Sequence, residues 1–118
     1  MTLTIVGLGP GSPEDLTRRV WAALESAQTV ILRTERHPCV PDLPVAKRPI
    51  SCDDLYEKHA SFTDVYDAIV ARVIEFAKVG DVLYAVPGDP MIGEATTAML
   101  RAAAASAGVA VEIQKLKE

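Results

Sequence analysis

The sequence lacks any run of apolar residues long enough to span a bilayer. It also lacks a basic segment within residues 1–9, which a secretory signal peptide would carry before its apolar stretch. These two absences argue against a membrane-spanning or secreted protein. We therefore expect a cytoplasmic protein with no membrane partner.

Clustered positive charge is missing as well. The 118 residues carry 12 Lys and Arg against 16 Asp and Glu, which gives a formal net charge of −4, and the basic residues are scattered along the chain. A protein that binds phosphate backbones needs a basic face. We therefore expect no nucleic-acid partner.

Cysteine is rare. Cys39 and Cys52 are the two cysteines, and the further ligands that a zinc site requires are missing around them. In a reducing cytoplasm we expect both to be free thiols. The sequence therefore predicts no metal site.

What the chain does have is a regular alternation of strand and helix patterns, with 49% hydrophobic and 24% charged residues, as in one globular domain with a core. Apolar and β-branched runs predict strands at residues 2–6, 29–32, 82–86 and 109–113, with a short further strand between 45 and 50. Helical spacing predicts helices at residues 13–27, 53–59, 62–77 and 93–107. This order predicts an α/β fold with a mostly parallel open sheet of about five strands and helices on both faces.

A glycine-rich turn, GLGPGSP at residues 7–13, follows the first strand. In an open parallel sheet, ligands bind at the carboxyl ends of the strands, where this turn lies. The spacing is close to a dinucleotide-binding fingerprint, but Ser12 stands where the motif needs its last glycine, and Pro10 removes an N–H from the loop. Glu35, after the second strand, keeps a nicotinamide-dependent enzyme open as a weaker hypothesis. A turn with no binding role is the remaining interpretation.

A second turn, VPGDP at residues 86–90, follows the strand at 82–86. Pro87 and Pro90 stiffen the loop, and Gly88 tolerates a positive φ. A rigid loop presents its backbone groups to a flat polar ligand with little entropy left to lose. Asp89 is the polar residue that we favour for binding, and a simple turn that satisfies Asp89 locally is the alternative.

Together the two turns carry a family resemblance. VGLGPGSPEDLT resembles the opening of the tetrapyrrole (corrin and porphyrin) methyltransferase superfamily, and YAVPGDPMIGEATT resembles its second signature, the GDP loop. RTERHP at residues 33–38 further resembles the YabN-like subgroup, in which a methylase-like domain is joined to a MazG-type nucleoside triphosphate pyrophosphohydrolase domain.

This resemblance implies S-adenosylmethionine as cofactor, S-adenosylhomocysteine as product, and a small-molecule acceptor such as a tetrapyrrole. It implies no metal, and it singles out no catalytic residue. It places the cofactor against Pro87, Gly88, Asp89, Pro90, Met91 and Ile92. It places the acceptor side of the cleft at Gly9, Pro10, Gly11 and Ser12.

The resemblance covers the first half of a domain about twice this length. It therefore implies that residues 1–118 are an N-terminal subdomain and that the C-terminal subdomain, with half of the cleft, is absent from this chain. We expect methyl transfer by the intact protein and none by this piece alone. Apolar surface near residues 86–92 would then be exposed, and a homodimer could cover it. The alternative function is a non-catalytic ligand-binding or regulatory module of a MazG-type nucleotide pyrophosphohydrolase.

Four further residues are singled out by position or type. Arg33 and Arg36 follow the second strand, where they could hold an acidic acceptor such as a propionate-bearing macrocycle or a phosphate. Pairing with Glu35 on the surface is the alternative. His37 is predicted in a surface loop, and a place near a ligand at the rim of the sheet, where it precedes Pro38, is the alternative. Trp21 is predicted in the core.

Overall fold

The computed structural model describes residues 1–45, 47–88, 90 and 95–114. Within them, five parallel strands form one sheet in the order β3-β2-β4-β1-β5. The strands are β1 (Thr2–Gly7), β2 (Val30–Leu32), β3 (Ile50–Ser51), β4 (Val82–Val86) and β5 (Ala110–Gln114). The predicted α/β fold with a five-stranded parallel sheet is confirmed.

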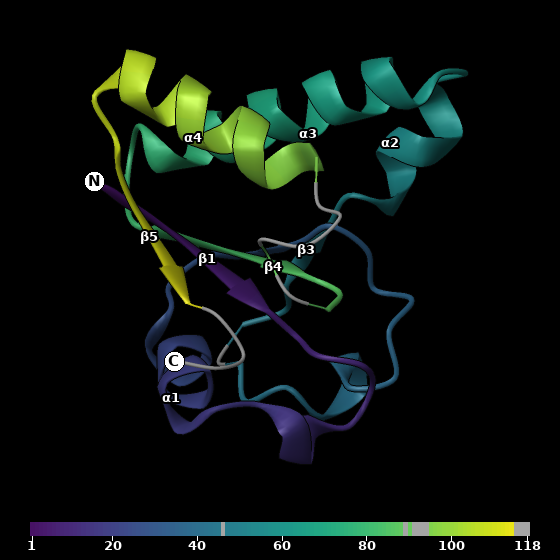
Figure 1. Cartoon of the computed structure of the whole chain (residues 1–118), viewed down its shortest axis with the longest axis vertical. Helices are drawn as coiled ribbons and strands as arrows, with labels where there is room; N and C mark the ends of the chain where they lie inside the picture. The colour runs from purple at the N-terminus through teal and green to yellow at the C-terminus, as the bar shows by residue number, and fades with distance from the viewer. Residues whose placement is uncertain (46, 89, 91–94, 115–118) are drawn as a thin grey trace.

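Helices cover both faces of this sheet (Figure 1). One face carries α1 (Arg18–Ser26). The opposite face carries α3 (Phe62–Ala77) and α4 (Ala95–Ala107), which pack side by side, with the short α2 (Asp53–Lys58) next to α3. The helices thus make two outer layers around a central sheet.

The central strand β4 shows why the sheet must be covered on both sides. All five of its side chains are buried, and they alternate between the two faces as strand geometry requires. Val82, Tyr84 and Val86 face the cluster under α3 and α4, whereas Leu83 and Ala85 face the cluster under α1. Continuous apolar strands of this kind are typical of parallel sheets enclosed by helices.

One predicted helix divides in the structure. Instead of a single helix over residues 13–27, the chain forms a 3₁₀ turn, η1 (Pro13–Asp15), and then α1. The backbone is extended at Leu16 and Thr17, and the Thr17 hydroxyl accepts a hydrogen bond from the Val20 amide at 3.1 Å. A second N-cap therefore starts a new helix.

The placement of Trp21 corrects a second prediction. Its exposed fraction is 37%, so it is not a core residue. Val20 and Leu24 lie on the sheet-facing side of α1, and each is fully buried. Trp21 follows Val20 by one position, about 100° around the helix, which turns its side chain away from that contact line.

The remaining elements follow their predicted ranges closely. α3 has the predicted bounds, and the Ser61 hydroxyl caps it by accepting from the Asp64 amide. β2 begins one residue later than predicted, β5 is shifted by one residue, and the short third strand lies at Ile50–Ser51. α4 is described from Ala95 onward, so the predicted start at residues 93–94 lies outside the described residues.

Candidate functional site

The two glycine-rich turns meet at the carboxyl edge of the sheet. β1 and β4 are neighbouring parallel strands, so the segments that follow them leave the sheet side by side. The Leu8 amide donates to the Val86 carbonyl at 2.8 Å. Beyond this pair, Gly9 and Gly88 exchange two backbone hydrogen bonds of 3.2 Å each. We call this pair, Gly9 and Gly88, the loop junction.

Both residues of the loop junction adopt a backbone conformation that favours glycine. Their φ angles are 72° at Gly9 and 68° at Gly88. A Cβ atom placed on Gly88 would meet no other atom of the described residues within 4 Å. Among the described residues, the space on this side of the loop junction is therefore open. A rigid backbone edge beside open space fits a small ligand that packs against the main chain.

Three of the predicted cofactor-binding residues, Asp89, Met91 and Ile92, lie outside the described residues. On either side of Asp89, Gly88 is partly exposed and Pro90 is buried. Val86 has an exposed fraction of 0% because it packs in the cluster beneath α4. The expectation that apolar surface is exposed from residue 86 onward is therefore wrong for Val86.

The four predicted acceptor-side residues have different surroundings. Gly9 is buried in the loop junction, and Pro10 beside it is exposed. A Cβ atom on Gly11 would lie 3.5 Å from the Pro38 ring, so this loop packs closely on the segment after β2. The Ser12 hydroxyl accepts a hydrogen bond from the Glu14 amide at 3.2 Å and caps η1. Ser12 therefore has a local structural contact whatever else it binds.

His37 is buried and contacts Gly9 of the loop junction, so its predicted surface position is wrong. Its exposed fraction is 9%. Nε2 lies 2.8 Å from the Gly9 carbonyl oxygen, and Nδ1 lies 3.2 Å from the Cys39 amide nitrogen. A carbonyl can only accept and an amide can only donate, so these contacts require a hydrogen on Nε2 and none on Nδ1. The sequence signal for this role is a histidine directly before Pro38, close behind a strand that ends at the same sheet edge.

Cys39 completes the contacts beneath the first loop. Its Sγ lies 3.1 Å from His37 Nδ1 and 3.8 Å from the Leu8 carbonyl oxygen. Burial raises the pKa of this thiol. A buried, protonated thiol is a poor nucleophile, so the pair of His37 and Cys39 is a structural support rather than a catalytic dyad. Cys39 and Cys52 are both free, as predicted.

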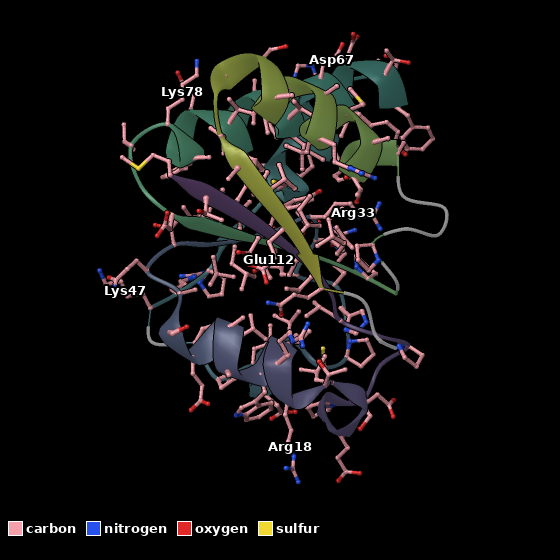
Figure 2. All side chains as sticks on the ribbon, turned by 60° about the vertical axis from the view of Figure 1, so that its left-hand side comes forward. Arg18, Arg33, Lys47, Asp67, Lys78 and Glu112 are labelled. Atoms are coloured by element: carbon pink, nitrogen blue, oxygen red, sulfur yellow. The ribbon has the colours of Figure 1, made fainter. Side chains whose placement is uncertain are left out.

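A polar cavity of about 440 Å³ opens beside this region. It lies at the carboxyl end of β2, which pairs with β4, and the Arg33 amide donates to the Ala85 carbonyl at 3.0 Å. Figure 2 shows Arg33 toward the arrowhead ends of the strands. The residues that line the cavity are Arg33, Thr34, Arg36, Asp53, Tyr56 and Glu57. The cavity and the loop junction therefore share one edge of the sheet.

Two features are absent from the described residues. In that part of the chain, no group of three or more His, Cys, Asp or Glu side chains could hold a metal ion. No helix there is both long and apolar enough to cross a membrane.

The same architecture occurs in solved structures, two of which are named as methyltransferases. Uroporphyrin-III-C-methyltransferase from Thermus thermophilus matches 97% of the chain with a TM-score of 0.74 and 29% identity. The native form of uroporphyrin III C-methyl transferase from the same organism matches 98% with a TM-score of 0.70 and 20% identity. Diphthine synthase matches 98% with a TM-score of 0.72 and 24% identity, which shows a shared fold. The chain thus shares the fold of these solved structures.

The family follows from the sequence match. Residues 2–114 match the family of Tetrapyrrole (Corrin/Porphyrin) Methylases, and the chain belongs to this family. Uncharacterized protein YabN of Bacillus subtilis (strain 168) is 40% identical over 99 residues, which is 83% of this chain and 20% of that protein. The chain thus spans a fifth of this relative and between 44% and 48% of the three solved chains.

Proposed function

We propose that this chain is the N-terminal subdomain, residues 1–118, of an S-adenosylmethionine-dependent methyltransferase. The loop junction forms one wall of the cleft that holds the cofactor and the methyl acceptor. The observation that carries this proposal is the reciprocal hydrogen bonding of Gly9 and Gly88 at the carboxyl edge of the sheet. It brings the two signature loops, nearly 80 positions apart in the chain, into a single backbone surface.

The residues of this edge divide into two roles. Pro87, Gly88 and Pro90, together with Asp89, Met91 and Ile92, line the cofactor side in this proposal. Gly9, Pro10, Gly11 and Ser12 line the acceptor side. When bound, the cofactor supplies a methyl group on a sulfonium centre that is already activated for displacement. The chain's own contribution is to orient both molecules, because positioning is the main demand of such a transfer.

The second wall of the cleft belongs, in this proposal, to a further subdomain. The chain spans between 44% and 48% of the solved chains that it resembles, which supports this division. The acceptor does not follow from the fold, because the similar structures are named for uroporphyrin III and for diphthine. A tetrapyrrole is one candidate acceptor, and the protein is proposed to act in the cytoplasm.

The test is isothermal titration of the complete protein with S-adenosylmethionine and S-adenosylhomocysteine. We expect saturable binding of both ligands. Gly88→Ala should weaken binding about tenfold, because alanine is strained at this φ and its methyl group enters the open space beside the loop junction. Gly80→Ala is the matched control, since its Cβ meets nothing in the described residues and its φ is not positive. Failure of both ligands to bind would overturn the proposal.

A regulatory module of a MazG-type nucleotide pyrophosphohydrolase is the second candidate function. It is favoured by the 40% identity to YabN, of which this chain covers 20%, so most of that protein lies outside the match. The RTERHP segment at residues 33–38 adds the resemblance to the MazG-joined subgroup. Cofactor binding without methyl transfer, together with altered nucleoside triphosphate hydrolysis when S-adenosylhomocysteine is added, would select this candidate.

A further inference from the structure

A second cavity, of about 310 Å³, lies between α1 and the sheet. It borders the carboxyl end of α1 and the neighbouring strands β4, β1 and β5. This volume suits a small molecule. None of the residues that line it belongs to the loop junction or to the cavity at Arg33, and the described ones include no Lys, Arg or His. The polar residues of its lining are Thr4, Ser26, Gln28, Asp81, Glu112 and Gln114.

Gln114 brings an unpaired oxygen atom to this cavity. Its exposed fraction is 8%, and its Oε1 has no hydrogen-bond partner among the described residues. Its Nε2 donates to Glu112 Oε1 at 3.3 Å. Because an ionised carboxylate can only accept, this contact fixes which end of the amide is the oxygen. A buried acceptor without a partner is costly, so a ligand that donates a hydrogen bond to Oε1 would be stabilised here.

The other polar groups of the cavity also present lone pairs. The Ser26 hydroxyl donates to the Ala22 carbonyl at 3.0 Å, which leaves the Ser26 oxygen able to accept. Asp81 Oδ1 accepts from the Thr2 amide at 2.8 Å, and the carboxylate keeps further lone pairs. Ala27 is the C-cap of α1, whose last turn contains no basic residue. Because the carboxyl end of a helix carries partial negative charge, all of these groups favour a cation that donates hydrogen bonds.

The two carboxylates of the cavity lie on opposite sides of β1. Asp81 directly precedes β4, Glu112 lies in β5, and β1 pairs with both strands. Their backbones are therefore two strand spacings, or about 10 Å, apart. Figure 2 shows Glu112 on the side of β5 that faces α1. The described residues hold no cluster of three metal-binding groups, so this arrangement fits two separated positive charges better than one metal ion.

We propose that this cavity binds an aliphatic diamine, with one ammonium group at Asp81 and the other at Glu112 and Gln114. An ammonium group has three N–H donors and no acceptor, which matches a lining rich in acceptors. Two ammonium groups also balance the charge of the two carboxylates. The methylene carbons between them contact Ala23 and Leu83, which line the cavity. Binding at this site does not depend on methyl transfer at the loop junction.

The test is isothermal titration of the complete protein with putrescine, a four-carbon diamine, at constant ionic strength. We expect saturable binding that Glu112→Gln and Asp81→Asn each weaken about tenfold, because each removes one charged partner. Asp81→Asn keeps an oxygen that can accept from the Thr2 amide. Glu75→Gln, at an exposed position of α3 on the opposite face of the sheet (Figure 1), loses the same charge and should leave the dissociation constant unchanged. No saturable binding, or equal weakening by Glu75→Gln, rules out the site.

Gln114→Leu separates ligand binding from structural support. Leucine removes the unpaired oxygen and keeps a side chain of similar size, so putrescine binding should weaken about tenfold. The urea midpoint of the ligand-free protein should not fall, because the lost oxygen has no partner in the described residues. A lower midpoint with unchanged putrescine binding would give Gln114 a structural role only and contradict the site.

Two further measurements identify the ligand class. Butylamine, which has a single ammonium group, should bind about tenfold more weakly than putrescine, and equal binding of the two would contradict a diamine. Lys115 and Lys117 follow Gln114 in the sequence and carry the same chemical group. Replacing both by glutamine should leave putrescine binding unchanged. If the double variant binds putrescine about tenfold more tightly, a lysine of this chain occupies the cavity, and a free diamine is not its ligand.

Discussion

Gly9 takes part in three hydrogen bonds that join segments far apart in the chain. Two run to the backbone of Gly88, and the third comes from the ring of His37 to the Gly9 carbonyl. Because Gly9 is buried and its φ is positive, no other residue type replaces it at low cost. At the scale of single residues, the proposed site depends on the backbone of Gly9 and on the His37 ring that bonds to its carbonyl.

His37 should therefore control the local stability of the first loop. We expect His37→Ala to lower the free energy of local opening by about 2 kcal/mol, because the Gly9 carbonyl and the Cys39 amide lose a buried partner. Amide hydrogen exchange of a peptide covering residues 7–11 should then be faster. His59→Ala is the control, since its ring makes no hydrogen bond to the described residues. If amide hydrogen exchange of residues 7–11 is equally fast in the two variants, His37 does not stabilise the first loop.

At the scale of elements, a bidentate ion pair between Arg72 and Asp54 joins α2 to α3. Arg72 donates from Nη1 to Asp54 Oδ1 at 2.8 Å and from Nη2 to Asp54 Oδ2 at 2.7 Å. The Nη1 also donates to the Ser51 carbonyl at 3.1 Å, so the same side chain holds the end of β3. The hydrogen bonds from Arg72 lower the pKa of Asp54. This tie fixes the short helix that lines the arginine cavity.

Removing the carboxylate of Asp54 gives a pH-dependent prediction. We expect Asp54→Asn to lower the free energy of unfolding by about 0.5–1 kcal/mol at neutral pH, because the pair is partly exposed. The folded pKa is lowered, so the stabilisation is present above the unfolded pKa and is lost as the pH falls through the folded pKa. Urea unfolding at neutral and acidic pH should show the two proteins converging in acid. Asp67→Asn, an exposed carboxylate of α3 with no partner in the described residues, should show neither effect.

The element scale also shows where sequence patterns succeed and fail. α3 was predicted with the correct bounds, because Val65, Ile69 and Val73 repeat at helical spacing and Ser61 supplies the cap. The pattern does not predict the break at Thr17, because residues 13–27 satisfy a helical spacing throughout, whereas in the structure Ser12 caps η1 and Thr17 caps α1. Val20 and Leu24 of α1 pack against the sheet, a contact that the local pattern does not contain.

At the scale of the whole molecule, both faces of the sheet carry a core. Leu24 of α1 and Ile69 of α3 lie on opposite sides, and each is fully buried. We expect Leu24→Ala and Ile69→Ala each to cost about 2–5 kcal/mol of unfolding free energy, because each leaves a cavity. Val79→Ala, at an exposed position, should cost less than about 0.5 kcal/mol. If urea denaturation shows no change in the unfolding free energy of Leu24→Ala, then α1 does not form a second core.

The sequence by itself determined the strand and helix order, the parallel sheet and the two signature loops, because these depend on periodicity and on glycine and proline placed close along the chain. It also favoured the correct family on those same residues. Tertiary structure alone decided that Gly9 bonds Gly88, that His37 is buried beneath them, and that Arg33 and Arg36 share a cavity with Tyr56. These contacts join residues from 23 to 79 positions apart, as in Arg33 with Tyr56 and Gly9 with Gly88. Their geometry is set by strand order and register, which no local pattern contains.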